Sequence, residues 1–371
     1  MIIAYYCNPI LIYIFIIFCL QGIFSFYNYS PKRVRELEQV AAVLEESLAH
    51  FGGIQQIRWV ASQRRALKAL LKNYVATCTH FADIAASKDR GAVKAKALLK
   101  KLQSPKFLTF LHFMVDFTEV LGCLSEAFQA DDLMVMEVLP EVEAVMWHLE
   151  EMKTSPGKCV SSLTNGKEYK GVSLSGEVHP ELDQLHLKLL SSAIDHLDCR
   201  FSALQKPPLS DFAVLNYSKW PYEKTKLAAF GNEEIGRLVQ HFSPVLTEKE
   251  VDAIPMQWMN FKNHLLQLRT SDPKVVYRDL LVLQPKNIIH VLPLIEIMLT
   301  HSMSTAIVER GFSHMNIIKG ETHTLLGNET LNNLLELKIN GPTFEDFSPV
   351  ESIIYWIDKS QGTRHINGHR L

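Results

Sequence analysis

Two pairs of neighbouring residues have the side chains used in general acid–base catalysis, Asp131-Asp132 and Asp195-His196. Such chemistry requires both groups within hydrogen-bond reach of one substrate. Both pairs lie in segments whose apolar spacing predicts helices, and successive side chains on a helix point about 100° apart. The members of each pair therefore point in different directions, and we expect neither pair to be catalytic.

Residues that could bind metal ions are scattered along the chain. His186, His196, His264 and His290 show no ligand spacing with one another, and the six cysteines form no Cys-x-x-Cys motif. This pattern indicates neither a zinc site nor a disulfide framework. We therefore assign no metal and no cofactor, and we expect buried free thiols in a reducing compartment.

Charge is segregated along the chain, although the formal net charge is only -2. The segment 54–106 contains 12 Lys and Arg against Asp83 and Asp89, whereas 107–151 contains ten acidic residues and no Lys or Arg. Two interpretations are open: the basic segment contacts DNA, or it is a solvated helix face that complements the acidic segment. The residues predicted for a nucleic-acid contact are Arg58, Trp59, Arg64, Arg65 and Lys68.

The N-terminus is strongly apolar. Residues 10–20 form an unbroken apolar run, apolar character extends over 2–29, and Lys32, Arg33 and Arg35 follow. A secretory signal has a positively charged region before its apolar run, and this chain has no such region. The apolar run only just reaches the length of a membrane span. We expect 1–30 to be a separate segment, either a secretory or membrane-anchoring one or a non-native start. A chain that begins at Pro31 is predicted to fold as well as the full one.

The remaining chain has mostly helical patterning. Apolar residues recur at intervals of three and four, which is typical of helices that cover a core. The predicted helices are 31–48, 61–85, 91–102, 107–128, 131–152, 181–201, 232–242, 248–269, 286–299, 302–318 and 329–339. The Ser- and Gly-rich segment 155–176 is predicted to be a flexible loop, and 275–283 is the best strand candidate. Apolar flanks favour core packing for Trp147, Trp220, Trp258 and Trp356.

Four blocks of sequence resemble hAT-superfamily transposases and the vertebrate host proteins derived from them, in the family's order. The most specific is Ser-Thr-Ala-Ile-Val-Glu-Arg-Gly-Phe-Ser at 304–313, followed by the leucine-rich segment 331–342. The others are the segment 57–62 with Arg58-Trp59, the segment 124–129 with Leu133, and 230–235 with Gln257-Trp258. Together they span roughly residues 36 to 356.

The resemblance implies a ribonuclease H-like fold with a helical insertion, and DNA strand cleavage and transfer as the chemistry. Three carboxylates would hold the divalent metal ions that activate water and stabilise the transition state. Glu309 matches the third acid. The first two should lie on strands before Trp59, where the four glutamates of 36–46 fall on a predicted helix. We therefore expect a mainly α chain that lacks most of the central sheet, with Glu309 vestigial and no catalysis.

The C-terminal block is the part of the family that dimerises. The resemblance places a dimerisation segment at 286–358, after a helical core at 31–285 and before a tail at 359–371. Its candidate contact residues are Ile307, Phe312, Met315, Ile318, Leu331, Leu334 and Leu335. The alternative is that both helices pack wholly inside the monomer.

The expected function is that of a nuclear or cytoplasmic host protein that dimerises with itself or with related hAT-derived proteins. One alternative is a DNA-binding regulator that uses 54–106. A second is a fragment of an active transposase or nuclease whose N-terminal catalytic strands are missing. Membrane association is expected only if the apolar segment at 2–29 is a genuine anchor.

Overall fold

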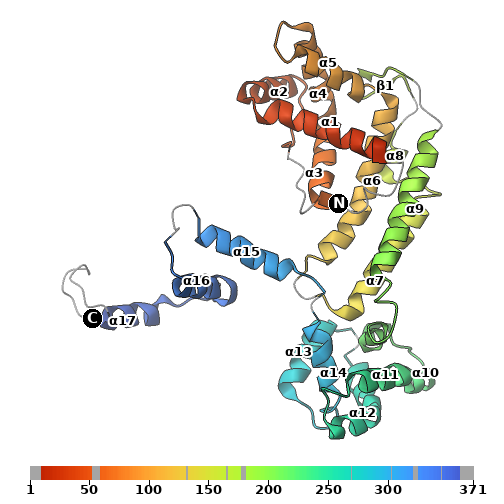
Figure 1. The fold of residues 1–371 in the computed structure, drawn as a ribbon, viewed down its shortest axis with the longest axis vertical. Helices are drawn as coiled ribbons and strands as arrows, with labels where there is room; N and C mark the ends of the chain where they lie inside the picture. Colours follow the sequence, from red (N-terminus) through yellow and green to blue (C-terminus); the bar gives the residue numbers. More distant parts are fainter. Residues whose placement is uncertain are drawn as a thin grey trace. The chain divides into compact units, whose positions relative to one another are not determined.

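Figure 1 shows a computed structural model of the protein, which describes residues 10–51, 59–130, 133–163, 166–176, 181–268, 270–301, 303–320, 325–343 and 345–359. These residues fold almost entirely into helices, so the expected mainly α class is confirmed. Within the described ranges, strands occur in one antiparallel hairpin, β1 (Glu168–Tyr169) and β2 (Val172–Ser173). The chain divides into two units, Met1–Ser304 and Thr305–Leu371.

The first unit is built from the following helices, two of which are short 3-10 helices labelled η. They are α1 (Ile10–Asn28), α2 (Pro31–Val43), α3 (Trp59–Lys72), α4 (Tyr74–Ala86), α5 (Ala92–Leu102), α6 (Pro105–Ala127), α7 (Val135–Glu151), α8 (Lys158–Ser161), α9 (Glu181–Phe201), η1 (Ser210–Leu215), η2 (Tyr217–Lys219), α10 (Lys224–Ala229), α11 (Asn232–Phe242), α12 (Glu248–Leu266), α13 (Pro273–Leu283) and α14 (Leu292–Thr300). The second unit contains α15 (Ala306–Ile318), α16 (Asn328–Asn340) and α17 (Pro349–Lys359).

Helix α6 is the centre of the first hydrophobic core. It packs against α3, α7, α8 and α9, with α7 and α9 running beside it in Figure 1. Among the described residues it is the one helix long and apolar enough to cross a bilayer, but 72% of its apolar window is buried in protein. A predominantly apolar helix belongs in a core when other helices surround it, as they do here.

Helix α1 belongs to the same core, so the expected separation of 1–30 from the domain is wrong for the part that is described. Its buried residues, at intervals of three and four, are Ile16, Cys19, Leu20, Ile23, Phe26 and Tyr27. The Phe26 ring meets Phe81 of α4 edge to face, with centroids 5.1 Å apart. The apolar run is therefore a core helix buried along one side, and Phe18 on its other side is 64% exposed.

The second core lies at the other end of α7. The start of α7 contributes Val135 and Met136, and Trp258, Phe261 and Ile295 complete its centre. Helix α14 is part of this core through Leu292, Leu294, Ile295 and Met298. The predicted boundary at 285/286 is therefore displaced, since the chain leaves the first unit only after Ser304.

The predicted strand at 275–283 is a helix. Asp272 accepts a hydrogen bond from the Lys274 backbone N–H at 3.0 Å, and Pro273 occupies the first turn of α13. An N-cap acid followed by proline starts a helix because the fixed proline φ suits the first turn. Val276, Tyr277 and Leu280 are buried at helical spacing. The β-branched residues were thus a weaker signal than the cap.

The segment 155–176 is structured in its described part, against the prediction of a flexible loop. Asp116 of α6 accepts hydrogen bonds from the Cys159 and Val160 backbone N–H groups, both at 3.0 Å, and so caps α8. The Tyr169 hydroxyl lies 3.0 Å from His112 Nε2. Side chains of α6, which is distant in sequence, therefore hold this segment in a defined structure that its local composition did not predict.

Candidate functional site

The predicted dimerisation residues lie on α15 and α16, which pack on each other. Leu331 is buried, Met315, Ile318 and Leu335 are half-buried, and the side chain of Ile307 lies outside the described residues. Phe312 and Leu334 are exposed, at 58% and 38%. The list therefore divides into residues that hold the two helices together and residues available to a partner.

Helix α17 carries an apolar face that was not predicted. Val350, Ile353, Ile354 and Ile357 follow the spacing i, i+3, i+4, i+7, which places them on one face of the helix, and all four are at least 43% exposed. This spacing is how an amphipathic helix presents anchors to a groove or a second helix. Pro349 in the first turn together with this spacing was a sufficient signal for the helix.

Glu309 lies exposed in the first turn of α15. Its Oε1 accepts a hydrogen bond from Thr305 Oγ1 at 3.4 Å, and a carboxylate in this position interacts favourably with the helix dipole. No group of three or more His, Cys, Asp or Glu that could hold a metal ion occurs among the described residues. The position of Glu309 has a structural explanation that requires no metal ion.

We predict that the purified chain neither nicks nor joins DNA with Mg²⁺ or Mn²⁺, since one carboxylate cannot hold two metal ions. A plasmid-nicking assay of the wild type and of Glu309→Ala should give the same background. Metal-dependent cleavage that disappears in Glu309→Ala would contradict this prediction.

The predicted nucleic-acid residues on α3 face acidic partners. Arg64 forms ion pairs with Glu119 at 3.2 Å and with Glu126 at 2.6 Å, and Lys68 pairs with Glu119. Arg65 is exposed, whereas Arg58 and the side chain of Trp59 lie outside the described residues. For Arg64 and Lys68, the interpretation as a helix face that complements the acidic segment is the one that the packing supports.

The third sequence block forms a buried structural turn. Gly231 has φ of 76°, and a Cβ there would lie 2.9 Å from the Trp258 ring. The Trp258 indole donates to the Phe230 carbonyl at 3.1 Å, and Lys262 Nζ donates to the Ala228 and Phe230 carbonyls at 2.8 and 2.9 Å. Burial lowers the pKa of Lys262 to about 8. These residues join α10, α11 and α12.

The tryptophan prediction is correct in two of the four positions. Trp220 and Trp258 are buried in the second core, whereas Trp147 is 77% and Trp356 47% exposed. Of the two acid–base pairs, Asp131-Asp132 lies outside the described residues. Asp195 is exposed on α9 and His196 is half-buried.

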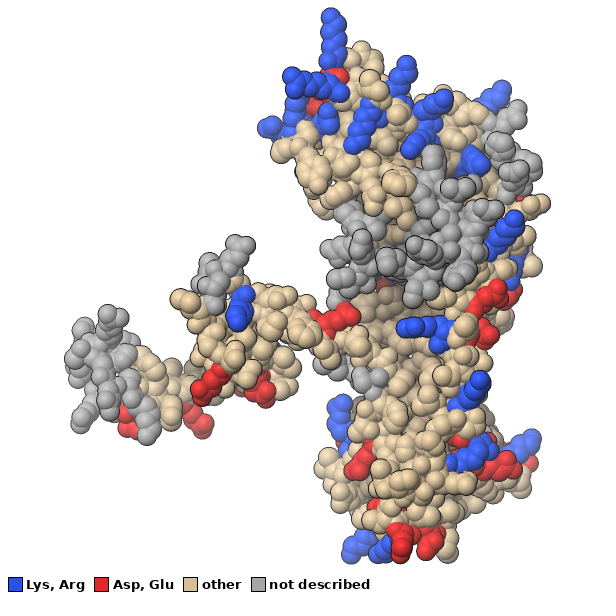
Figure 2. Space-filling view, viewed as in Figure 1, with Lys and Arg blue, Asp and Glu red and all other residues tan. Residues whose placement is uncertain are grey.

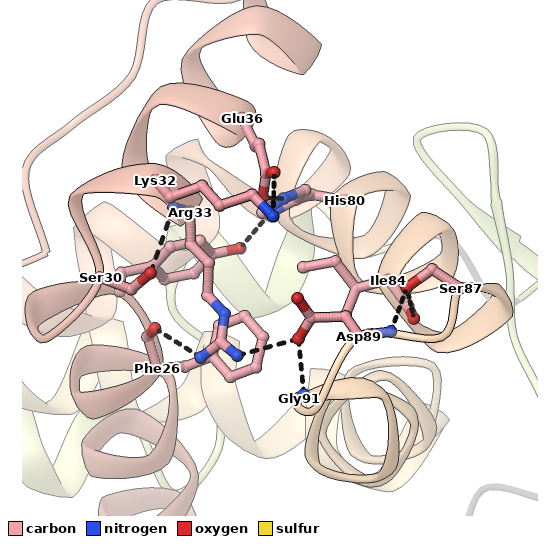
Figure 3. A network of polar contacts seen from close by, with 11 residues as sticks. Phe26, Ser30, Lys32, Arg33, Glu36, His80, Ile84, Ser87, Asp89 and Gly91 are labelled. Atoms are coloured by element: carbon pink, nitrogen blue, oxygen red, sulfur yellow. Dashed lines mark hydrogen bonds and ion pairs between the residues drawn. The ribbon is translucent and has the colours of Figure 1, made fainter.

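A polar network joins α1, α2 and α4 (Figure 3). His80 is buried, with Nδ1 3.0 Å from the Tyr27 hydroxyl and Nε2 3.6 Å from a Glu36 carboxylate oxygen. Burial lowers the pKa of His80. His80 and Glu36 also line a groove of about 740 Å³ between α2 and α4. The network connects α4 to the consecutive helices α1 and α2 and fixes the position of α2.

No protein-family model and no solved structure matches this chain.

Proposed function

We propose that this protein acts through dimerisation of its C-terminal unit, as a domesticated and catalytically inactive derivative of a hAT transposase. The order of the four sequence blocks supports the derivation. The ribonuclease H-like ancestry belongs to this proposal as well, with the helices taken as the helical insertion and C-terminal part of that fold.

The observation that carries the proposal is the amount of apolar surface on the second unit. Besides the α17 face, Phe312, Leu334 and Leu337 are exposed, while among its described residues only Ala306 and Leu331 are buried. Contiguous exposed apolar surface is unfavourable in water and marks interaction sites. A second copy supplies an equivalent apolar face, and a two-fold arrangement would let each α17 cover the other.

Ile353→Asp combined with Ile357→Asp tests this proposal. Both side chains are exposed, so the change leaves the packing of α15 on α16 intact while it places two charges at the centre of the proposed interface. Charges buried without partners are strongly unfavourable, and we expect a dimer to become a folded monomer. Light scattering at micromolar concentration measures the mass, and circular dichroism checks the helix content.

The matched control is Ser352→Asp combined with Tyr355→Asp, which adds the same charge on the other side of α17 and should leave the dimer intact. Leu334→Asp with Leu335→Asp gives a second test on α16, although Leu335 is half-buried and contributes to internal packing. A wild-type chain that is monomeric at micromolar concentration would overturn the proposal.

Two other functions differ in their requirements. A DNA-binding regulator requires exposed cations within 54–106, and α5 carries several. A fragment of an active transposase requires the two further acids on strands that precede Trp59. The sequence of the 5′ end of the transcript tests the transposase-fragment alternative, because it shows whether such strands are encoded upstream.

A further inference from the structure

A cluster of cations lies on the turn between α4 and α5 and along α5. Its members are Lys88, Arg90, Lys94, Lys96 and Lys100, all of them exposed. Figure 2 shows Lys and Arg gathered over the part of the unit where α2, α4 and α5 lie in Figure 1, with few acidic side chains among them. We call these five residues the elbow surface.

The elbow surface differs from the basic residues of α3 in its pairing. Arg64 and Lys68 are neutralised by carboxylates of α6. Within the described part of the chain, no ion pair is found for any of the five elbow cations, and Lys94 Nζ instead contacts Ser25 Oγ at 3.1 Å. Arg65 and Lys72 of α3 are exposed as well, but the largest group of open cations in segment 54–106 lies on α5 and on the turn before it.

The backbone beneath the elbow surface is held in place (Figure 3). Asp89 Oδ1 accepts from Arg33 Nη2 at 3.1 Å and from the Gly91 backbone N–H at 2.6 Å. The Arg33 guanidinium lies 4.0 Å from the centre of the Phe26 ring. A Cβ at Gly91 would overlap Arg33. Arg33 thus links the turn between α4 and α5 to α1 and α2. The backbone that carries the elbow cations is therefore held in one position.

The arrangement on α5 suits a linear array of phosphates. Lys96 and Lys100 are four residues apart, which places them on one side of the helix and about 6 Å apart along its axis. The opposite side, with Ala95, Leu98 and Leu102, is buried. Two adjacent lysines on one side can contact one nucleic-acid strand together.

We propose that the elbow surface binds the phosphate backbone of a nucleic-acid duplex without reading its sequence. Neutralised phosphates release counterions, so a few lysines suffice for salt-dependent binding. A lipid surface is a poorer fit, since interfacial helices insert Trp, Phe or Leu, and the exposed side of α5 offers Val93 as its apolar residue. This inference is independent of the proposed dimerisation.

The test compares the full chain with Lys96→Glu combined with Lys100→Glu, using fluorescence anisotropy of labelled 20-base-pair DNA and RNA duplexes at several salt concentrations. We expect the wild type to lose affinity steeply with salt. Loss of two phosphate contacts should weaken binding at least about tenfold and lower the salt dependence by about two ions. Binding to both duplexes supports a backbone contact, and binding to one identifies the preferred nucleic acid.

The control is Lys224→Glu combined with Lys249→Glu. It changes the net charge by the same amount at exposed positions of α10 and α12, far from α5 in sequence. Both variants replace exposed side chains, so thermal unfolding should match that of the wild type. Equal losses in the two variants would reduce the effect to net charge and overturn the proposal. Binding to vesicles with anionic lipid but to neither duplex would overturn it as well.

Discussion

Replacing Phe26 with Ala is expected to lower the free energy of unfolding by about 3 to 5 kcal/mol. Phe26 is 1% exposed and packs edge to face on Phe81 of α4, beneath the Arg33 guanidinium. Its removal leaves a cavity between α1 and α4 and withdraws the ring on which Arg33 rests. Urea unfolding followed by circular dichroism measures the loss.

Phe18→Ala is the matched control, since Phe18 is on the same helix but 64% exposed, and we expect it to cost less than about 0.5 kcal/mol. For the same reason a chain that begins at Pro31 should be insoluble or unfolded, contrary to the prediction from sequence. If that shorter chain unfolded at the same urea concentration as the full one, the assignment of α1 to the core would be incorrect.

Acidification from pH 7 to about pH 4 is expected to destabilise the protein through His186. The imidazole stacks on the Phe113 ring with centroids 4.0 Å apart, and burial lowers its pKa to about 4, although Asp183 acts in the opposite direction. The unfolded chain takes up a proton near pH 6.5, whereas the folded chain does so only near pH 4. The free energy of unfolding therefore falls across this interval, by about 2 to 3 kcal/mol for His186 alone.

His186→Phe isolates this contribution, because it retains an aromatic ring on Phe113 but takes up no proton. Urea unfolding at a series of pH values should give a flatter profile for this variant than for the wild type. Burial lowers the pKa of His80 and His112 in the same direction, so part of the acid sensitivity should persist. A His186→Phe profile parallel to that of the wild type would contradict the assignment.

The presence of helices was the most predictable feature of this protein. Segments 181–201 and 232–242 match α9 and α11 at both ends. In each, one apolar face repeats at helical spacing, and that pattern is local. The predicted helix 61–85 is instead two helices, broken at Asn73, whose side-chain amide pairs with both backbone groups of Ala49 at 2.6 and 2.8 Å. A contact across 24 residues cannot be seen in a local pattern.

The candidate sites were less predictable, for a related reason. The sequence indicated that segment 54–106 is basic and that α15 and α16 are amphipathic. Which cations remain open depended on carboxylates distant along the chain, such as Glu126 opposite Arg64, 62 residues away. The spacing of the α17 face was readable in the sequence, but its exposure was not.

The sequence by itself determined that this protein is mainly helical, that its charge is segregated and that its N-terminal run is apolar, because composition and periodicity are properties of neighbouring residues. The tertiary structure alone decided that α1 lies in a core, that α14 belongs to the first unit and that no carboxylate of the described residues forms an ion pair with the elbow surface. The residues of an apolar or basic face are close together in the sequence, so the sequence shows the face. The residues that cover it come from distant segments, which only folding brings together.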